Sequence, residues 1–318
     1  MNKKMKFQMM LAERYHDMPR PLQKGKYPFI LAVIIIPILH FFVFYVGINF
    51  GSIMLAFQKT QYVKGVGEVV SYTADNFKTI FNWFTQGGTK LQIALKNTFQ
   101  LWIVDCLMVI PIYIIAYNFS KNMKGSKFFR VMLNLPTIIS AVAYTTMVTS
   151  ILQPNVGALY VLSEKYLGIK LPALLQSEQY AWTTVICYCI WSGLYANLLL
   201  IEAAIRRIPQ EVVEAAKMDG AGNGGLIRYI IVPMTWGTMS TIFLIKVSQI
   251  FTITGPILLL TNGQYNTQTL NFWFYEQVAV AGEYNVSAAG GIVLTLIGIP
   301  VVWLFRKIAN KISGDLEY

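Results

Sequence analysis

The sequence predicts an all-α membrane protein with about six transmembrane helices, and three observations support this. Of the 318 residues, 55% are hydrophobic and only 13% are charged, and the mean hydropathy is +0.49. A water-soluble domain of this size needs more polar surface. The apolar residues also form long runs, and the net charge of +11 comes from Lys and Arg at the ends of those runs. A nucleic-acid-binding protein would instead carry a basic stripe.

Six windows are long enough to cross the hydrocarbon core of a bilayer, which takes roughly 17 to 25 helical residues. They are residues 27–57, 93–119, 128–152, 180–205, 234–260 and 287–305. Pro37, Pro111, Pro136 and Pro300 lie inside four of these windows. Because a lipid-embedded helix tolerates proline where neighbouring groups satisfy the freed carbonyls, we expect kinks at these positions rather than breaks.

The distribution of Lys and Arg predicts the orientation. Basic residues occupy the N-terminal segment, the second and fourth connections and the C-terminal tail: Lys3, Lys4, Lys6, Arg14, Arg20, Lys24, Lys26, Lys121, Lys124, Lys127, Arg130, Arg206, Arg207, Lys217, Arg228, Arg306, Lys307 and Lys311. The fifth connection, residues 261–286, contains neither Lys nor Arg. Since cationic flanks resist translocation, both termini should be cytoplasmic. Residues 1–26 then form a cytoplasmic N-terminal segment, and residues 27–318 form the transmembrane domain.

The fourth connection, residues 206–233, has the most specific pattern. Pro209 disfavours helix before it and favours a helical start after it. Gly220 can adopt the left-handed conformation that ends a helix. Asp219 can then cap a second short helix, which Pro233 stops. The pattern predicts two short helices at an angle to each other on the cytoplasmic surface.

The first of these short helices combines an anionic side chain with two small ones, Glu214, Ala215 and Ala216. Small side chains allow another backbone to approach closely, which suits a helix that docks into a partner's groove. Together with the residues around the bend, this triplet resembles the EAA loop of binding-protein-dependent ABC importer permeases, and its extended form resembles the carbohydrate branch of that family. The motif positions are Glu214, Ala215, Ala216, Asp219, Gly220, Ala221, Ile230 and Pro233.

Further residues along the chain resemble the same branch: Asn97-Thr98, Pro136, Asn155-Val156-Gly157, Leu260-Thr261-Asn262-Gly263 and Ala288-Ala289. The resemblance implies a type I ABC importer permease fold in the cell membrane. It implies that Glu214 contacts a cytoplasmic ATPase and that Gly220 forms the bend between the two helices. The partners it implies are a second permease subunit, either a paralogue or a copy, two ATPase subunits and an extracytoplasmic binding protein that delivers a carbohydrate.

Two patterns resemble functional motifs but lack their context. Glu202-Ala203-Ala204 repeats the triplet, yet Ile208 stands where the bend glycine belongs, so we assign Glu202 to the fourth span. The glycines at 220, 222 and 225 match a dinucleotide-binding G-x-G-x-x-G, but no strand precedes them. The chain also lacks a phosphate-binding G-x-x-x-x-G-K-[ST], so any ATP hydrolysis must occur on another polypeptide. No catalytic residue, cofactor or metal site is predicted.

Polar residues inside the spans are candidates for the substrate path, because ionisable groups are costly there. Lys246, in the fifth window, could line a water-filled cavity with hydroxyl, amide and aromatic groups suited to a sugar; alternatively, Lys246 pairs with an acid on its own helix or on a partner helix, and the polar residues bridge helices. The candidates are Lys246, Gln249, Thr252, Trp191, Tyr195 and Asn197.

The sequence is also compatible with other functions. An ion-coupled secondary transporter would use acidic groups near the midplane, and Asp105 is the candidate for such a group. A polytopic membrane enzyme would show acids or metal ligands clustered at one membrane face, which this sequence does not. An importer for a solute other than a sugar would share the same coupling loop.

Overall fold

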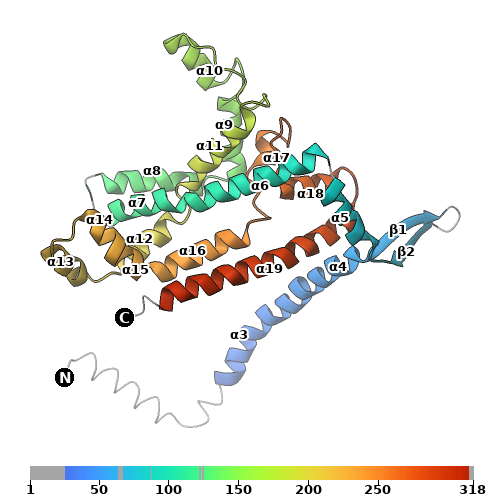
Figure 1. Ribbon diagram of the computed structural model, residues 1–318, viewed down its shortest axis with the longest axis horizontal. Helices are drawn as coiled ribbons and strands as arrows, with labels where there is room; N and C mark the ends of the chain where they lie inside the picture. Colours follow the sequence, from blue (N-terminus) through green and yellow to red (C-terminus); the bar gives the residue numbers. More distant parts are fainter. Residues whose placement is uncertain (1–25, 64–66, 87, 122, 124, 315–318) are drawn as a thin grey trace. The chain divides into compact units, whose positions relative to one another are not determined.

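The computed structural model describes residues 26–63, 67–86, 88–121, 123 and 125–314, shown in Figure 1. The chain divides into two compact units, Met1–Thr73 and Ala74–Tyr318. Apart from Lys26, the predicted N-terminal segment lies outside the described residues. Both units are mainly helical, and the all-α prediction is confirmed.

The first unit begins with one long apolar helix. It is assembled from α3 (Lys26–His40), the π-helical η1 (Phe41–Val46) and α4 (Gly47–Ala56). Its 29 residues Pro28–Ala56 are long and apolar enough to cross a membrane, as the first window predicts. Pro37 lies inside α3, and the π-helical segment begins four residues after it. The helix continues past Pro37 without a break, as the sequence predicts.

A hairpin follows this helix, where the sequence predicts only a connection. Strands β1 (Gln58–Val63) and β2 (Gly67–Tyr72) pair antiparallel, with Gln58 opposite Tyr72 and Val63 opposite Gly67. Both strands contain Val, Thr or Tyr, which favour β-strands. Each strand has only six residues, however, so its pattern is weak evidence for a strand in a sequence dominated by long apolar windows.

The second unit consists of helices. Its first half contains α5 (Asp75–Gln86), α6 (Thr89–Leu107), α7 (Val109–Ser120), α8 (Ser126–Ile138), α9 (Ala141–Ile151), α10 (Ala158–Leu162), η2 (Ser163–Leu167), α11 (Ala181–Gly193) and α12 (Leu198–Arg206). Its second half contains α13 (Gln210–Met218), α14 (Asn223–Leu226), η3 (Ile227–Ile231), α15 (Val232–Met234), α16 (Trp236–Ser248), α17 (Ile257–Leu260), α18 (Leu270–Ala279) and α19 (Tyr284–Gly314). Within the unit, α7 packs against α12 and α16 packs against α19.

Three further windows are confirmed as helical stretches long enough to cross a membrane: Thr89–Ser120, Ala181–Arg206, which contains a turn at residues 194–197 between α11 and α12, and Tyr284–Ile312. With the helix of the first unit, the described residues contain four helices that could cross a membrane, or five if the bent pair Asn223–Met234 and Trp236–Ser248 forms one span. Pro300 lies within α19 without breaking it.

The third and fifth windows are not single helices. Helix α8 ends at Ile138, and Ile139 and Ser140 are extended before α9 begins. The expected kink at Pro136 is therefore a break two residues further on. In the fifth window α16 ends at Ser248. The chain then turns through Gly255, at φ +60°, because glycine favours the left-handed region and the following proline limits helix before it.

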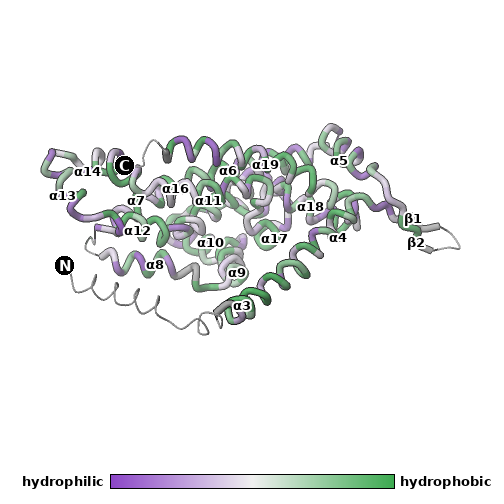
Figure 2. The backbone as a smooth tube through the Cα atoms, turned by 90° about the horizontal axis from the view of Figure 1, so that it is seen from below, coloured by the Kyte–Doolittle hydropathy of each residue, from purple (hydrophilic) through white to green (hydrophobic). Residues whose placement is uncertain are grey.

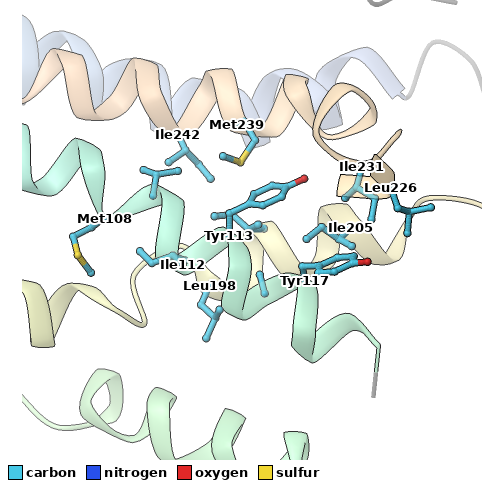
Figure 3. Packing of buried hydrophobic residues seen from close by; sticks show 13 residues of the cluster. Met108, Ile112, Tyr113, Tyr117, Leu198, Ile205, Leu226, Ile231, Met239 and Ile242 are labelled. Carbon is cyan, nitrogen blue, oxygen red and sulfur yellow. The ribbon is translucent and has the colours of Figure 1, made fainter. Parts of the chain in front are cut away.

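The main apolar core of the second unit joins α7, α12 and the α14–α16 segment. Residues spaced four apart on α7, such as Tyr113 and Tyr117, face Ile205, Leu226 and others in Figure 3. This core fixes the fourth connection against the second span, and so it positions the predicted coupling loop.

A polar cluster fixes the fifth connection to the middle of α6. The Asn97 amide donates to the carbonyls of Asn266 and Gln268 at 2.8 and 2.9 Å. The Thr98 hydroxyl accepts from the Leu270 N–H at 2.7 Å. Buried polar groups need such partners, which gives Asn97 and Thr98 a structural role.

Candidate functional site

The first short helix of the fourth connection forms where the sequence predicts it. Pro209 is the N-cap residue and has an extended backbone conformation, with ψ 134°, and α13 begins at the next residue, Gln210. Glu211 lies in its first turn and Lys217 in its last, which suits the helix dipole. The Gln210 amide donates to the Glu214 carboxylate at 2.7 Å, a pair one turn apart.

The bend at the end of α13 is built from two backbone hydrogen bonds. The Ala221 N–H donates to the Ala216 carbonyl at 2.9 Å, and the Gly220 N–H donates to the Lys217 carbonyl at 3.0 Å. Gly220 has φ +85°. These features define a Schellman cap, which needs a residue that tolerates the left-handed conformation. The prediction that Gly220 ends this helix in the left-handed conformation is confirmed.

The second short helix differs from the prediction in two respects. Asp219 is the C-cap of α13, and Gly222 is the N-cap of α14, because the cap occupies residues 219–221 and delays the next helix. Pro233 lies one residue before the end of the helical stretch Asn223–Met234, so it does not stop the helix at Val232. The helical path instead bends by 73° between Asn223–Met234 and Trp236–Ser248. At this bend the Thr235 hydroxyl shares a hydrogen bond of 2.8 Å with the Tyr113 hydroxyl on α7.

Helix α13 has an inner and an outer face. Val213 and Ala216 are partly buried and pack against the α7–α12 core. Glu214 and Ala215 are exposed, and Met218 is 87% exposed. The Glu214-Ala215-Ala216 triplet is therefore divided: the first two side chains are open to a partner, while the third anchors the helix to its own chain.

Glu202 belongs to α12, as the sequence predicts. Its side chain is 5% exposed and accepts from two arginines. Arg130 on α8 donates to both carboxylate oxygens, at 3.1 Å from Nε and 2.5 Å from Nη2, and the Arg206 Nε donates at 2.9 Å. This network was not predicted. A glutamate in an apolar window close to a basic connection is the signal that could have indicated it.

An aromatic cleft lies between α9 and α11, with a volume of about 670 Å³. Among the substrate-path candidates, Trp191 is in its lining, and its side chain is 58% exposed. The rings of Tyr144 and Tyr188 lie 5.7 Å apart, and the Tyr188 hydroxyl shares a 2.7 Å hydrogen bond with Thr145. The surface of the cleft is almost entirely apolar, and its aromatic faces are suited to the apolar C–H faces of pyranose rings.

The ammonium group of Lys246 is already paired. Its Nζ donates to the Asp105 carboxylate on α6 at 2.7 Å, and the two side chains are 7% and 30% exposed. The Lys246 carbonyl accepts from the Trp102 indole at 2.9 Å. Of the two roles that the sequence left open for Lys246, the structure favours helix pairing.

The remaining path candidates do not line the aromatic cleft. Tyr195 and Asn197 lie on the turn between α11 and α12, where Asn197 has φ +62°. Gln249 and Thr252 are exposed beyond the end of α16. Sequence spacing could not show this, because the helix ends before these residues.

Comparisons with known proteins agree with this architecture. AglF, the alpha-glucoside transport system permease protein of Rhizobium meliloti (strain 1021), is 28% identical over 150 residues, covering 44% of this chain and 45% of that protein. YteP of Bacillus subtilis (strain 168), a polygalacturonan/rhamnogalacturonan transport system permease protein, is 22% identical over 294 residues, covering 91% of this chain and 90% of that protein.

A solved structure shares the fold. A chain of the bacterial alginate ABC transporter, in complex with an alginate pentasaccharide-bound periplasmic protein, superposes with a TM-score of 0.75 at 22% identity, over 93% of this chain and 99% of that chain. Residues 94–314 match the family described as the binding-protein-dependent transport system inner membrane component. This match includes the fourth connection (residues 206–233), the aromatic cleft and well over half of the sequence. The chain is a multi-pass membrane protein that belongs to this permease family.

Proposed function

We propose that the chain forms half of the translocation pathway of an ATP-driven importer for a carbohydrate, an oligosaccharide in particular. The single observation that carries this is helix α13, which presents Glu214 and Ala215 outward while Val213 and Ala216 fix it to the core. A short helix with exposed small and anionic side chains fits a groove on a partner. The chain itself contributes binding and motion, and no catalysis.

The partner at α13 is a cytoplasmic ATPase subunit in this proposal. Glu214 and Ala215 contact it, the Asp219-Gly220-Ala221 cap fixes the angle between the two short helices, and Pro233 precedes the bend into α16. Because α12 leads into α13 and α15 leads into α16, a movement of α13 displaces two spans. Coupling of this kind needs a two-state element rather than a reaction on this chain.

The aromatic cleft is the best-supported place for the sugar. Trp191 lines it together with Tyr144 and Tyr188, and its volume of about 670 Å³ lies in the range of small-molecule sites. The names of AglF and YteP, which both describe transport of sugars, support this substrate class. Tyr195 and Asn197 follow Trp191 along the same span, and Gln249 and Thr252 are exposed beyond α16, so they remain proposed contacts along the path.

The complete transporter contains a second permease subunit, two ATPase subunits and an extracytoplasmic binding protein. Both termini of this chain are cytoplasmic. In both views of the second unit, the beginning of α8, helix α13 and the end of α19 lie at one end, and Figure 2 colours much of that end hydrophilic. That placement supports a common cytoplasmic side for the basic connections.

Uptake into membrane vesicles tests this function. Radiolabelled oligosaccharides should enter only when ATP is inside and the cognate binding protein is outside. E214A should reduce uptake while leaving membrane insertion intact, because it removes an exposed contact to the ATPase. Uptake driven by an ion gradient alone, without ATP, would reject the importer.

A further inference from the structure

The cytoplasmic ends of three helices meet at one buried carboxylate. Glu202 on α12 accepts from Arg130 on α8 through both carboxylate oxygens and from Arg206 one turn later on its own helix. The Arg206 Nη2 also donates to the carbonyl of Phe119 at 3.0 Å, and the Arg130 Nη2 approaches the same carbonyl at 3.4 Å. Phe119 lies in the last turn of α7, where helix carbonyls lack partners within the helix. The network therefore joins α7, α8 and α12.

The described side chains of helix α8 make few apolar contacts within this chain. Among its described side chains only Ser126 is buried, and Leu133 is partly buried against the core. The large apolar side chains Phe128, Phe129 and Val131 are 57–65% exposed. Within this chain, apolar packing by the described side chains of α8 is therefore sparse, and the two-point contact between Arg130 and Glu202 is a specific connection to the rest of the unit.

The same carboxylate lies close to the coupling helix. Helix α12 continues into α13 through residues 207–209. The N–H groups of Arg207 and Ile208 donate to the carbonyls of Ala204 and Ile205 at 3.2 Å, and Pro209 has a fixed φ. This link is short and hydrogen-bonded, so a movement of α13 carries the end of α12, and Glu202, with it.

We propose that Glu202 is a positioning residue whose contacts with Arg130 and Arg206 transmit the movement of the coupling helix to α8 and to the end of α7. This inference rests on the proposed function, and it adds the contacts within the chain through which the movement of α13 reaches α7 and α8. A paired guanidinium and carboxylate hold a fixed orientation, so α8, the first half of the broken third window, follows α12. The break at Ile139 and Ser140 then separates this movement from α9.

The test uses the assembled transporter with spin labels at Lys127→Cys on α8 and Arg306→Cys on α19, in a chain whose three cysteines are replaced by alanine. Both labelled residues are exposed and lie outside the network. We expect the distance between the labels to change between the nucleotide-free complex and the complex trapped with ATP and vanadate. R130Q and E202Q should abolish that change and reduce sugar transported per ATP hydrolysed at least tenfold, while the ATPase subunits still co-purify with the permease.

The unlabelled variant K127Q is the matched control. It removes one positive charge from the same helix, three residues before Arg130, and should transport as the unsubstituted chain does. The double variant R130Q/E202Q should be no worse than either single variant, because residues that act through one contact are non-additive. R130K keeps the charge without the two-point geometry, so it should recover part of the coupling.

Three results would overturn the proposal. The label distance in R130Q could change as it does in the unsubstituted chain, transport per ATP could stay unchanged in both variants, or transport could fall only in proportion to loss of assembled complex. The last result would show a purely structural role. If the unsubstituted transporter carries none of the oligosaccharides tested, the proposed substrate fails, but the nucleotide-driven distance still tests the role of Glu202.

Discussion

At the scale of single residues, the backbone conformation of Gly220 is the most testable feature of the coupling loop. Its φ of +85° lies in the left-handed region, and a Cβ added there would meet nothing within 4 Å. The cost of a substitution is therefore conformational rather than steric. G220A should destabilise the bend by about 1 kcal/mol, roughly a fivefold loss of the bent form, and should lower ATP-coupled uptake accordingly.

Asparagine provides the matched comparison at this position, because it adopts the left-handed conformation more readily than alanine. G220N should retain most of the uptake that G220A loses, and hydrogen exchange of the α13 amides should follow the same order. Equal damage in both variants would show that space or docking, and not backbone conformation, governs this residue.

The Asp105–Lys246 pair predicts a second effect at this scale. Removing one member leaves a buried or half-buried charge without a partner, which typically costs about 3 to 5 kcal/mol. K246M and D105N should each lower the thermal unfolding temperature in detergent. The double variant D105N/K246M should recover much of that loss. A double variant that loses the sum of both effects would argue against direct pairing.

Glu276 predicts a dependence on pH in the fifth connection. Burial raises the pKa of this carboxyl above its ordinary value, and the nearby Lys90 lowers it by a smaller amount. Its carboxylate accepts from the Gln268 amide at 2.7 Å. A raised pKa in the folded state means that stability is fully present below the unfolded pKa and declines as the pH rises through the folded value.

The amide in E276Q imitates the protonated carboxyl and still accepts from Gln268. The variant should therefore match the unsubstituted chain at pH 4 and unfold at a higher temperature at pH 8, as measured by differential scanning fluorimetry. A variant that is less stable than the unsubstituted chain at pH 8 would reverse the sign and contradict the assignment.

At the scale of elements, the cleft between α9 and α11 predicts a role for an exposed indole. W191A should lower the maximal uptake rate at saturating binding protein, because aromatic contacts contribute about 1 kcal/mol beyond area burial. W303A is the control: Trp303 on α19 is similarly exposed, at 62% against 58%, and lies outside the cleft. Equal effects of the two substitutions would remove the cleft from the proposed path.

The sequence predicted some elements well because their signals are local. Pro209 and Gly220 set the bounds of α13 through the conformations that each residue allows. The turn that ends α16 was missed because apolar residues continue past Ser248, and hydropathy alone does not show where the backbone leaves the helix. The break after Ile138 was missed for the same reason, since Pro136 indicates a disturbance but not its size.

Contacts between distant parts of the chain could not be predicted in this way. Glu202 was correctly assigned to a span, but its partner Arg130 is 72 residues away in sequence. Lys246 was recognised as unusual, whereas the choice between a cavity and an ion pair depended on how α6 and α16 pack. The pattern of a single sequence indicates which charged residues lie in apolar segments. The packing of the helices determines which partners neutralise those charges.

At the scale of the whole molecule, the membrane orientation is the prediction with the broadest consequence, and α19 offers a direct test. Glu283 precedes this helix and Lys311 lies in its last turn, and both are exposed. A rise of 1.5 Å per residue separates them by about 42 Å, close to the thickness of a bilayer with its headgroups.

In a chain with its three cysteines replaced by alanine, a membrane-impermeant maleimide added to intact cells should label E283C but not K311C. Inverted vesicles should give the opposite result. Labelling of both positions from one side would mean that α19 does not span the membrane, and the coupling loop could then not be assigned to the cytoplasm by charge alone.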